Sequence, residues 1–145
     1  MTVQTFIKIR TEFEGMHSYP NAGLIDSKIA FLENTHRHIF KVEVTISVNH
    51  LDRELEFFLV KWALNEFITS GDQNYKSCEM IASEILNNHL LPKYGDRCYS
   101  VSVSEDGESD GIVKYRPTTK LVKLKELRSI CTNQSILTNG RNQNG

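Results

Sequence analysis

The sequence has few of the features that mark membrane-spanning or secreted proteins. No apolar run approaches the roughly 20 residues that span a bilayer. Residues 1–15, MTVQTFIKIRTEFEG, lack the basic and then uniformly apolar pattern of a secretory signal. The three cysteines, Cys78, Cys98 and Cys131, are odd in number and have no C-x-x-C spacing, which argues against a disulfide framework and a cysteine-based zinc knuckle. We therefore expect a cytoplasmic protein without a membrane partner.

The chain also has little net charge, but its charges are unevenly distributed. The formal net charge is −1. Residues 119–145 hold five basic side chains and one acidic side chain, which leaves 12 basic and 17 acidic residues in 1–118, a formal charge of −5. Nucleic-acid binding rests largely on basic side chains that neutralise phosphates. The acidic main part of the chain therefore makes nucleic acid an unexpected partner.

Length and composition predict one domain. A chain of 145 residues with 39% hydrophobic and 24% charged residues is ordinary for a soluble globular domain, and no internal repeat is present. The periodic patterns lie in residues 1–118, which we expect to be the domain. Residues 119–145 are basic and then polar without a clear period, so we expect a partly helical and then disordered tail.

Alternating patterns predict two long strands near the N-terminus. Apolar side chains at Val3, Ile7, Ile9 and Phe13 alternate with charged ones, and the strand is expected to end at His17. The even positions from 40 to 48 are all apolar, which predicts a second strand, with residues 36 and 38 on the same face. The composition of residues 18–33 predicts a loop that contains a short apolar stretch, IAFL.

The second half of the domain predicts two helices and a hairpin. Residues 55–68 have apolar side chains three and four apart. Ser77 is expected to cap a helix with an apolar stripe from Cys78 to Leu90, which ends near Pro92 and Gly95. Residues 98–115 alternate around an acidic turn that contains glycine, which predicts a hairpin. The order strand, strand, helix, helix, strand, strand predicts an α+β fold, ββααββ, with an antiparallel sheet and both helices on one side.

Two histidines at the start of the second strand are candidate metal ligands. Residues two apart on a strand point the same way, so His36 and His38 can reach one ion. His17 shares the face of Ile7, Ile9 and Phe13, and it lies beside the pair if the two strands are neighbours. Three imidazoles leave one position of a tetrahedral zinc open, as in catalytic sites. The alternative interpretation is that these are ordinary, half-buried strand histidines, because H-x-H by itself is a weak motif.

Five short motifs occur in order within residues 3–116: FEGMH, HRH, EFFLVK, SCEMIA and VSVSED. Together they resemble the 6-pyruvoyl-tetrahydropterin synthase and 6-carboxytetrahydropterin synthase family. The histidine that closes the family's first strand corresponds to His17 in FEGMH, and the family's H-G-H corresponds to HRH, with Arg37 in place of glycine. The opening of the family's first helix resembles EFFLVK, and SCEMIA resembles the signature of its second helix, with Glu79 at the glutamate. The family glutamate that follows the third strand falls on Glu105 in VSVSED.

The resemblance implies a fold, an assembly and a ligand set. The fold would be the tunnelling fold, whose sheets pair edge to edge into rings, so we expect a homo-oligomer, a trimer or a hexamer of two stacked rings, with pockets between subunits. His17, His36 and His38 would hold zinc. Glu105 would bind the amide and amino edge of a pterin or purine-like small molecule, although the acidic turn that it begins would also explain a solvated glutamate.

The sequence departs from the family at the groups that move protons. The family cysteine precedes H-x-H by four or more residues; four residues before it stands Leu32, and no cysteine lies between His17 and His38. The aspartate-histidine pair that follows the first family helix is absent as well. Some relatives have a glutamate close to H-x-H, and Glu33 is placed to act as general base. Cys78 and Cys98 are expected to be buried structural thiols.

Two functions follow as expectations. The first is a zinc-dependent lyase of pterin or deazaguanine-precursor metabolism, of the kind used in queuosine biosynthesis, that acts on a dihydroneopterin triphosphate-type substrate. The second is a non-catalytic binding protein for a purine- or pterin-like nucleotide that kept the fold and lost the proton relay. We favour the first, and the missing cysteine is the feature that argues for the second.

Overall fold

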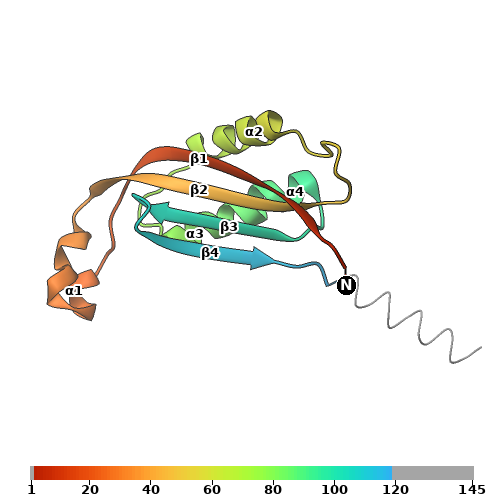
Figure 1. The fold of residues 1–145 in the computed structure, drawn as a ribbon. Coiled ribbons are helices and arrows are strands. Elements are labelled where there is room, and N and C mark those ends of the chain that lie inside the picture. Colours follow the sequence, from red (N-terminus) through yellow and green to blue (C-terminus); the bar gives the residue numbers. More distant parts are fainter. Residues whose placement is uncertain (1, 119–145) are drawn as a thin grey trace, which may run out of the picture.

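The fold is known from a computed structural model, which describes residues 2–118. Four strands form one antiparallel sheet in the order β1-β2-β3-β4. The predicted α+β class, the strand order along the chain and the hairpin are confirmed (Figure 1). The expected tail at 119–145 lies outside the described residues. The strands span Thr5–His17 (β1), His36–Val48 (β2), Tyr99–Glu105 (β3) and Ser109–Tyr115 (β4).

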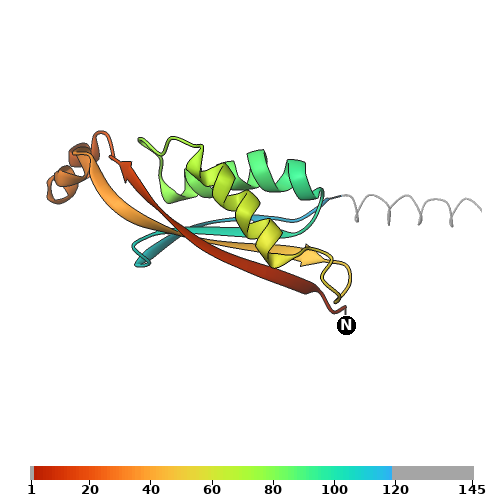
Figure 2. The ribbon, with the colours of Figure 1, turned by 90° about the horizontal axis from the view of Figure 1, so that it is seen from above.

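The helices between β2 and β3 cover one face of the sheet, as predicted (Figure 2). The first is α2, Phe57–Thr69, which begins after Glu56, whose side chain accepts a hydrogen bond from the Leu59 amide. The second runs without a break through α3, Cys78–Glu84, the π-helical η2, Ile85–Leu90, and α4, Leu91–Tyr94.

The predicted cap and stop of this second helix are both present. The Ser77 side chain accepts from the Met80 amide, and Gly95, at φ 80°, ends the helix. The π-helical turn was not predicted. It precedes Pro92, which has no N–H to bond the carbonyl four residues earlier, so a regular α-helical ladder could not continue there.

The core lies between the sheet and the helices. Burial alternates along β1 and β2, with the odd residues of β1 and the even residues of β2 facing the helices. Each fully buried aliphatic or phenylalanine side chain contributes about 1.5–3 kcal/mol to folding. The largest fully buried side chains are Phe40, Val42, Val44, Ile46, Leu64, Ile85, Leu90, Val101 and Val103.

The segment between β1 and β2 differs from the predicted loop. It contains a short helix, α1, Ala22–Ile25, and a 3₁₀ helix, η1, Ser27–Glu33, which together lie beyond one end of the sheet (Figure 1). The Asp26 side chain caps η1 by accepting from the Lys28 amide. Helices this short are defined by such local caps rather than by an apolar period, so the composition alone indicated a loop.

A tight turn joins β3 to β4 at the same end of the sheet. The Glu108 amide donates to the Glu105 carbonyl oxygen over 3.1 Å, and the two central residues, Asp106 and Gly107, have φ values of 53° and 79°. Two left-handed residues in this position make the type I′ geometry, which suits the twist of a hairpin. The turn therefore determines where the side chains of Glu105 and Asp106 point.

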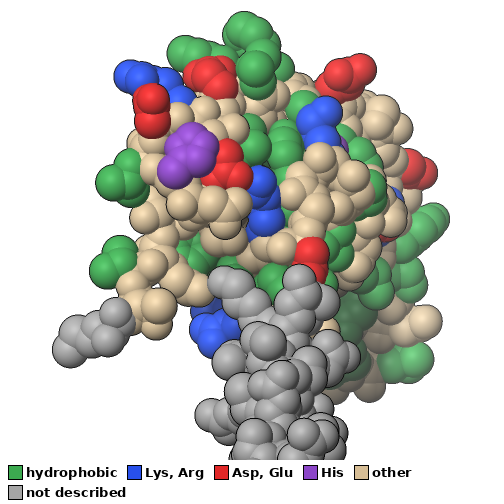
Figure 3. All heavy atoms as spheres, turned by 90° about the vertical axis from the view of Figure 1, so that its right-hand side faces the viewer, with side chains coloured by type: hydrophobic (Ala, Val, Ile, Leu, Met, Phe, Trp, Pro, Cys, Tyr) green, Lys and Arg blue, Asp and Glu red, His purple; other side chains and the backbone are tan. Residues whose placement is uncertain are grey.

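The opposite end of the molecule, where β1 begins, has a mixed surface. In this view acidic, basic and apolar side chains are interspersed (Figure 3).

Within residues 2–118, no helix is long and apolar enough to cross a membrane. Trp62 and Phe58 on α2 are 62% and 64% exposed, so neither belongs to the core.

Candidate metal centre and adjoining cavity

The register of β1 and β2 brings the three predicted histidines together. His17 is paired directly with His36, and Gly15 with His38, so the end of β1 lies beside the start of β2. Their ring centroids are 4.8 to 5.1 Å apart, and the rings meet edge to face. One ring nitrogen of each lies within 4.8 Å of the others. The sequence prediction that these three side chains share one site is therefore supported by the geometry.

Backbone carbonyl groups orient two of the rings. His17 Nδ1 lies 3.0 Å from the carbonyl oxygen of Lys76, and His36 Nδ1 lies 2.7 Å from that of Asn34. A carbonyl oxygen can only accept, so each Nδ1 carries a proton and donates it. In the neutral ring the lone pair is then on Nε2, which is the nitrogen left for a metal.

A carboxylate orients the third ring. Asp106 Oδ2 lies 2.6 Å from His38 Nδ1, and Asp106 Oδ1 accepts from the Ile39 amide over 2.9 Å. The hydrogen bond with His38, together with that from Ile39, lowers the pKa of Asp106, so it stays ionised. A carboxylate behind a ligating imidazole fixes its tautomer and raises its basicity.

The fit to a metal is supported by an unpaired atom. His38 Nε2 is buried and has no hydrogen-bond partner among the described residues. A buried polar atom without a partner costs about 1–3 kcal/mol, and a metal ion would remove that cost. Three neutral imidazoles suit zinc and similar divalent transition metals. The cluster could therefore hold a metal ion, and the identity of the ion belongs to the proposal below.

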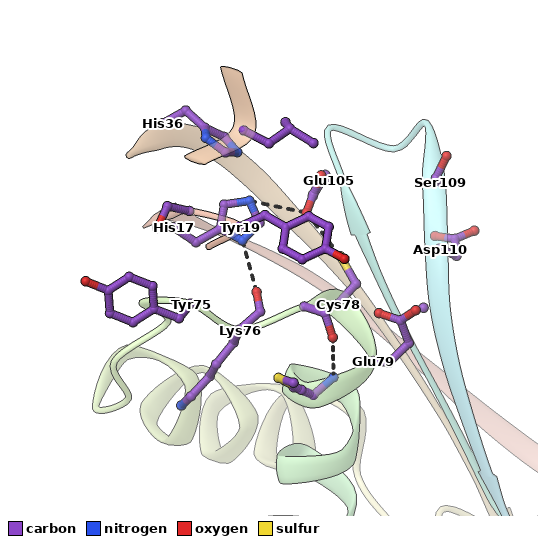
Figure 4. Close-up of a pocket in the computed structure, with 15 residues that line it drawn as sticks. His17, Tyr19, His36, Tyr75, Lys76, Cys78, Glu79, Glu105, Ser109 and Asp110 are labelled. Carbon is purple, nitrogen blue, oxygen red and sulfur yellow. Dashed lines mark hydrogen bonds and ion pairs between the residues drawn. The ribbon is translucent and has the colours of Figure 1, made fainter. Parts of the chain in front are cut away.

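Glu105 extends from the end of β3 toward the histidines. Its Oε1 lies 3.3 Å from His17 Nε2 (Figure 4). Its Oε2 lies 3.7 Å from His38 Nε2. Glu105 pairs with Phe40, which lies two residues after His38 on the same face of β2. Glu105 is therefore part of the histidine site and not only a solvated member of an acidic turn.

A cavity of about 450 Å³ adjoins the site, within the range of about 300–1,000 Å³ for small-molecule pockets. His17, His36 and Glu105 line one side, and the first turn of α3 lines another (Figure 4). The acidic side chains Glu79, Glu105 and Asp110 line it together with one basic residue, Lys76. The Lys76 ammonium group is 2.9 Å from a carboxylate oxygen of Glu84.

Cys78 also lines the cavity, where its thiol lies against Glu105. Cys78 is 8% exposed, which confirms a buried thiol, whereas Cys98 is only half-buried. The Cys78 Sγ donates to Glu105 Oε1 over 3.8 Å. Burial, and secondarily the Glu105 carboxylate, raises the pKa of this thiol to about 12, so it stays protonated at neutral pH.

The predicted general base lies apart from this cluster. Glu33 is the last residue of η1, and its Oε1 accepts a hydrogen bond from the Gly23 amide over 2.8 Å. The neighbouring Leu32 lines the cavity instead. Successive residues of a 3₁₀ helix point about 120° apart, so only one of the two can face the histidines. The assignment of Glu33 as a base stays a prediction.

Sequence reasoning missed Asp106. The acidic turn was recognised, but nothing in its composition distinguishes the residue that reaches His38 from the others. The signal available was the Asp-Gly dipeptide, which is typical of a type I′ turn.

Comparisons with known proteins add little to this geometry. No known protein family and no curated protein matches the chain. Among solved structures, it is similar to the uncharacterized protein WS1659 from Wolinella succinogenes, with 14% sequence identity and a TM-score of 0.42 over 77% of this chain and 99% of that chain. A likeness this distant supports neither a family nor a function.

Proposed function

We propose that this protein is a zinc-dependent enzyme similar to 6-pyruvoyl- and 6-carboxytetrahydropterin synthases, with a tunnelling fold, acting on a dihydroneopterin triphosphate-type substrate. The observation that carries the proposal is the set of three histidines whose Nδ1 atoms are all engaged, which leaves three Nε2 atoms for one metal beside a small-molecule cavity. The motif order along the sequence supplies the substrate class.

His17, His36 and His38 are the residues that would hold zinc. When bound, zinc supplies Lewis-acid polarisation of a hydroxyl or carbonyl oxygen of the substrate side chain. Lys76, Asn34 and Asp106 would keep the three rings oriented.

Glu105 is proposed to recognise the ring of the substrate. An ionised carboxylate can accept two hydrogen bonds from the adjacent ring N–H and exocyclic amino group of a pterin or a guanine. The adenine edge does not offer that pair of donors. Glu105 lines the cavity and its side chain is 38% exposed, so it is accessible to such a ligand.

Proton transfer in this site would need a general base near the metal. Glu33 would act as general base, and for that its carboxylate would have to leave the Gly23 amide that it now accepts from. The protonated Cys78 does not take over the role of the family cysteine, because a thiol with a pKa of about 12 is rarely ionised at neutral pH.

The positions of Leu32 and Glu33 favour a second candidate function. With Leu32 at the cavity and Glu33 turned to Gly23, the site could bind a pterin- or purine-like nucleotide without converting it. Turnover is what separates the two candidates.

The assembly that goes with either function is a ring. In the sheet that the structure describes, β1 and β4 are edge strands, and exposed edges invite pairing with another chain. We propose a trimer or a hexamer, with the cavity completed by a neighbouring subunit. Light scattering at micromolar protein concentration tests this, and a monomeric mass would contradict it.

The test of the function combines metal analysis, calorimetry and product analysis on purified full-length protein. We expect one zinc per chain, and its loss in the His36→Ala, His38→Ala double variant. Zinc-loaded protein should bind dihydroneopterin triphosphate and a guanine nucleotide more tightly than an adenine nucleotide. The preference should be about 1.5–3 kcal/mol, the contribution of hydrogen bonds to a charged group.

The outcomes separate the alternatives. Conversion of the dihydroneopterin compound, followed by chromatography, supports the enzyme, whereas tight binding without conversion supports the binding protein. Zinc-free wild-type protein, or a preference for the adenine nucleotide, would contradict both.

A further inference from the structure

The position of Glu105 raises an electrostatic question that substrate recognition does not answer. His17 Nδ1 donates a hydrogen bond to the Lys76 carbonyl oxygen and His38 Nδ1 donates one to Asp106, so in the neutral rings each Nε2 carries a lone pair. These Nε2 atoms lie 3.3 Å (His17) and 3.7 Å (His38) from oxygens of the Glu105 carboxylate. A lone pair this close to a carboxylate oxygen is unfavourable unless a positive charge lies between the two atoms. His38 Nε2 is buried and has no hydrogen-bond partner in residues 2–118.

The distances match those between ligands of one metal ion. For bonds of about 2.0–2.1 Å to nitrogen and 2.0–2.2 Å to oxygen, two ligands of a tetrahedral zinc are roughly 3.3 Å apart. The observed separations from the Glu105 oxygens are 3.3 Å to His17 Nε2 and 3.7 Å to His38 Nε2. One cation could therefore contact the carboxylate and both rings at once.

We infer that Glu105 is the fourth protein ligand of the metal when the cavity holds no substrate. The site would then be a closed shell of three imidazoles and one carboxylate, rather than the open three-histidine site of a typical catalytic zinc. This inference rests on the proposed metal centre. It implies that an incoming pterin-type ligand draws the carboxylate of Glu105 away from the metal and leaves a coordination position open for the substrate oxygen.

A proton on His17 Nε2 is the other cation that could lie between the ring and Glu105. The resulting ion pair would not need a metal, and Glu105 would then add nothing specific to metal affinity. Metal binding by variants of Glu105 therefore distinguishes the two arrangements.

The experiment measures zinc affinity by competition with a chromogenic chelator, in wild type, Glu105→Gln and Glu108→Gln. Glu108 is an exposed residue of the same turn, so its variant removes an equal charge without changing a ligand. We expect Glu105→Gln to weaken zinc binding by about 100-fold or more. Removing an outer-shell partner weakens metal binding by about 10–100-fold, and the loss of a direct ligand should be at least as large. Glu108→Gln should change it by less than about threefold, because exposed charges are screened.

Cobalt(II) substituted for zinc gives a second readout. The visible absorption of the wild-type cobalt protein should differ from that of Glu105→Gln, and adding dihydroneopterin triphosphate should change the wild-type spectrum. Circular dichroism of the metal-free proteins checks that the variant folds, which the partial exposure of Glu105 at a strand end favours.

Each outcome decides the inference. If wild type binds no metal, the proposed metal centre and this inference both fail. If wild type binds zinc and Glu105→Gln binds it within threefold of wild type, Glu105 is not a ligand, while the three-histidine centre stands. Equal losses in both variants would reveal a general charge effect and also overturn the inference.

Discussion

Gly111 should be intolerant of even one added methyl group. It is a buried residue of β4 that faces the start of α3. A Cβ built there would lie 2.6 Å from the Glu79 amide nitrogen, 2.8 Å from the Cys78 carbonyl carbon and 2.9 Å from the Cys78 Cβ. Two of these are backbone atoms, which cannot rotate away as the end of a flexible side chain can. The Gly111→Ala variant must therefore move α3 off the sheet or bend β4.

The expected cost follows from that clash. Overpacking by one methyl group costs about 1–3 kcal/mol, and contacts this short with backbone atoms place Gly111→Ala at the upper end. We expect the free energy of unfolding to fall by about 2–3 kcal/mol, measured by urea denaturation followed by far-ultraviolet circular dichroism in the presence of a metal chelator. The chelator removes any contribution of metal binding to stability.

Gly71→Ala is the matched control. Its Cβ would meet the flexible Gln73 side chain at 3.2 Å and has no backbone contact closer than 3.5 Å. We expect a change within about 1 kcal/mol, which includes the stabilising effect of reduced freedom in the unfolded chain. If Gly111→Ala is as stable as Gly71→Ala, the close approach of α3 to β4 described above is wrong.

Two further predictions concern Asp106 and His89. Asp106→Asn should weaken zinc binding about 10–100-fold, because the carboxylate that orients His38 is lost. The backbone should be kept, because Asn tolerates the left-handed conformation at φ 53°. Unchanged zinc affinity in a chelator competition would contradict this role of Asp106. The His89 ring is stacked on Phe67, with ring centroids 5.0 Å apart. Its burial, and secondarily the charge of Lys93, lowers the pKa of the ring. The unfolded chain therefore binds the proton more readily, and the free energy of unfolding falls as pH falls below about 6.5. Urea titrations of metal-free protein across that range should show a weaker pH dependence in His89→Phe than in wild type, and equal slopes would count against it.

The strands and helices follow from the sequence because their patterns report directly on backbone geometry. Side chains alternate along a strand, so the apolar residues at Ile7, Ile9 and Phe13 place His17 on the same face without any knowledge of the fold. The stripe of the second helix is explained in the same way, since residues three and four apart share one side. The π-helical turn and the two short helices before β2 escape such patterns, because each depends on a few local hydrogen bonds.

The composition of the site was decided only by tertiary structure. The sequence by itself predicted His17, His36 and His38 as metal ligands, and the register of β1 and β2 brings them together. It could not show that Glu105 and Asp106 take different partners, since adjacent acids in a turn look alike until the left-handed backbone directs each side chain. Nor could it show that Leu32, and not Glu33, lines the cavity. Burial faces repeat with the period of an element and can be read along the chain, whereas the direction of a side chain at the end of an element depends on the turn and on the strand beside it.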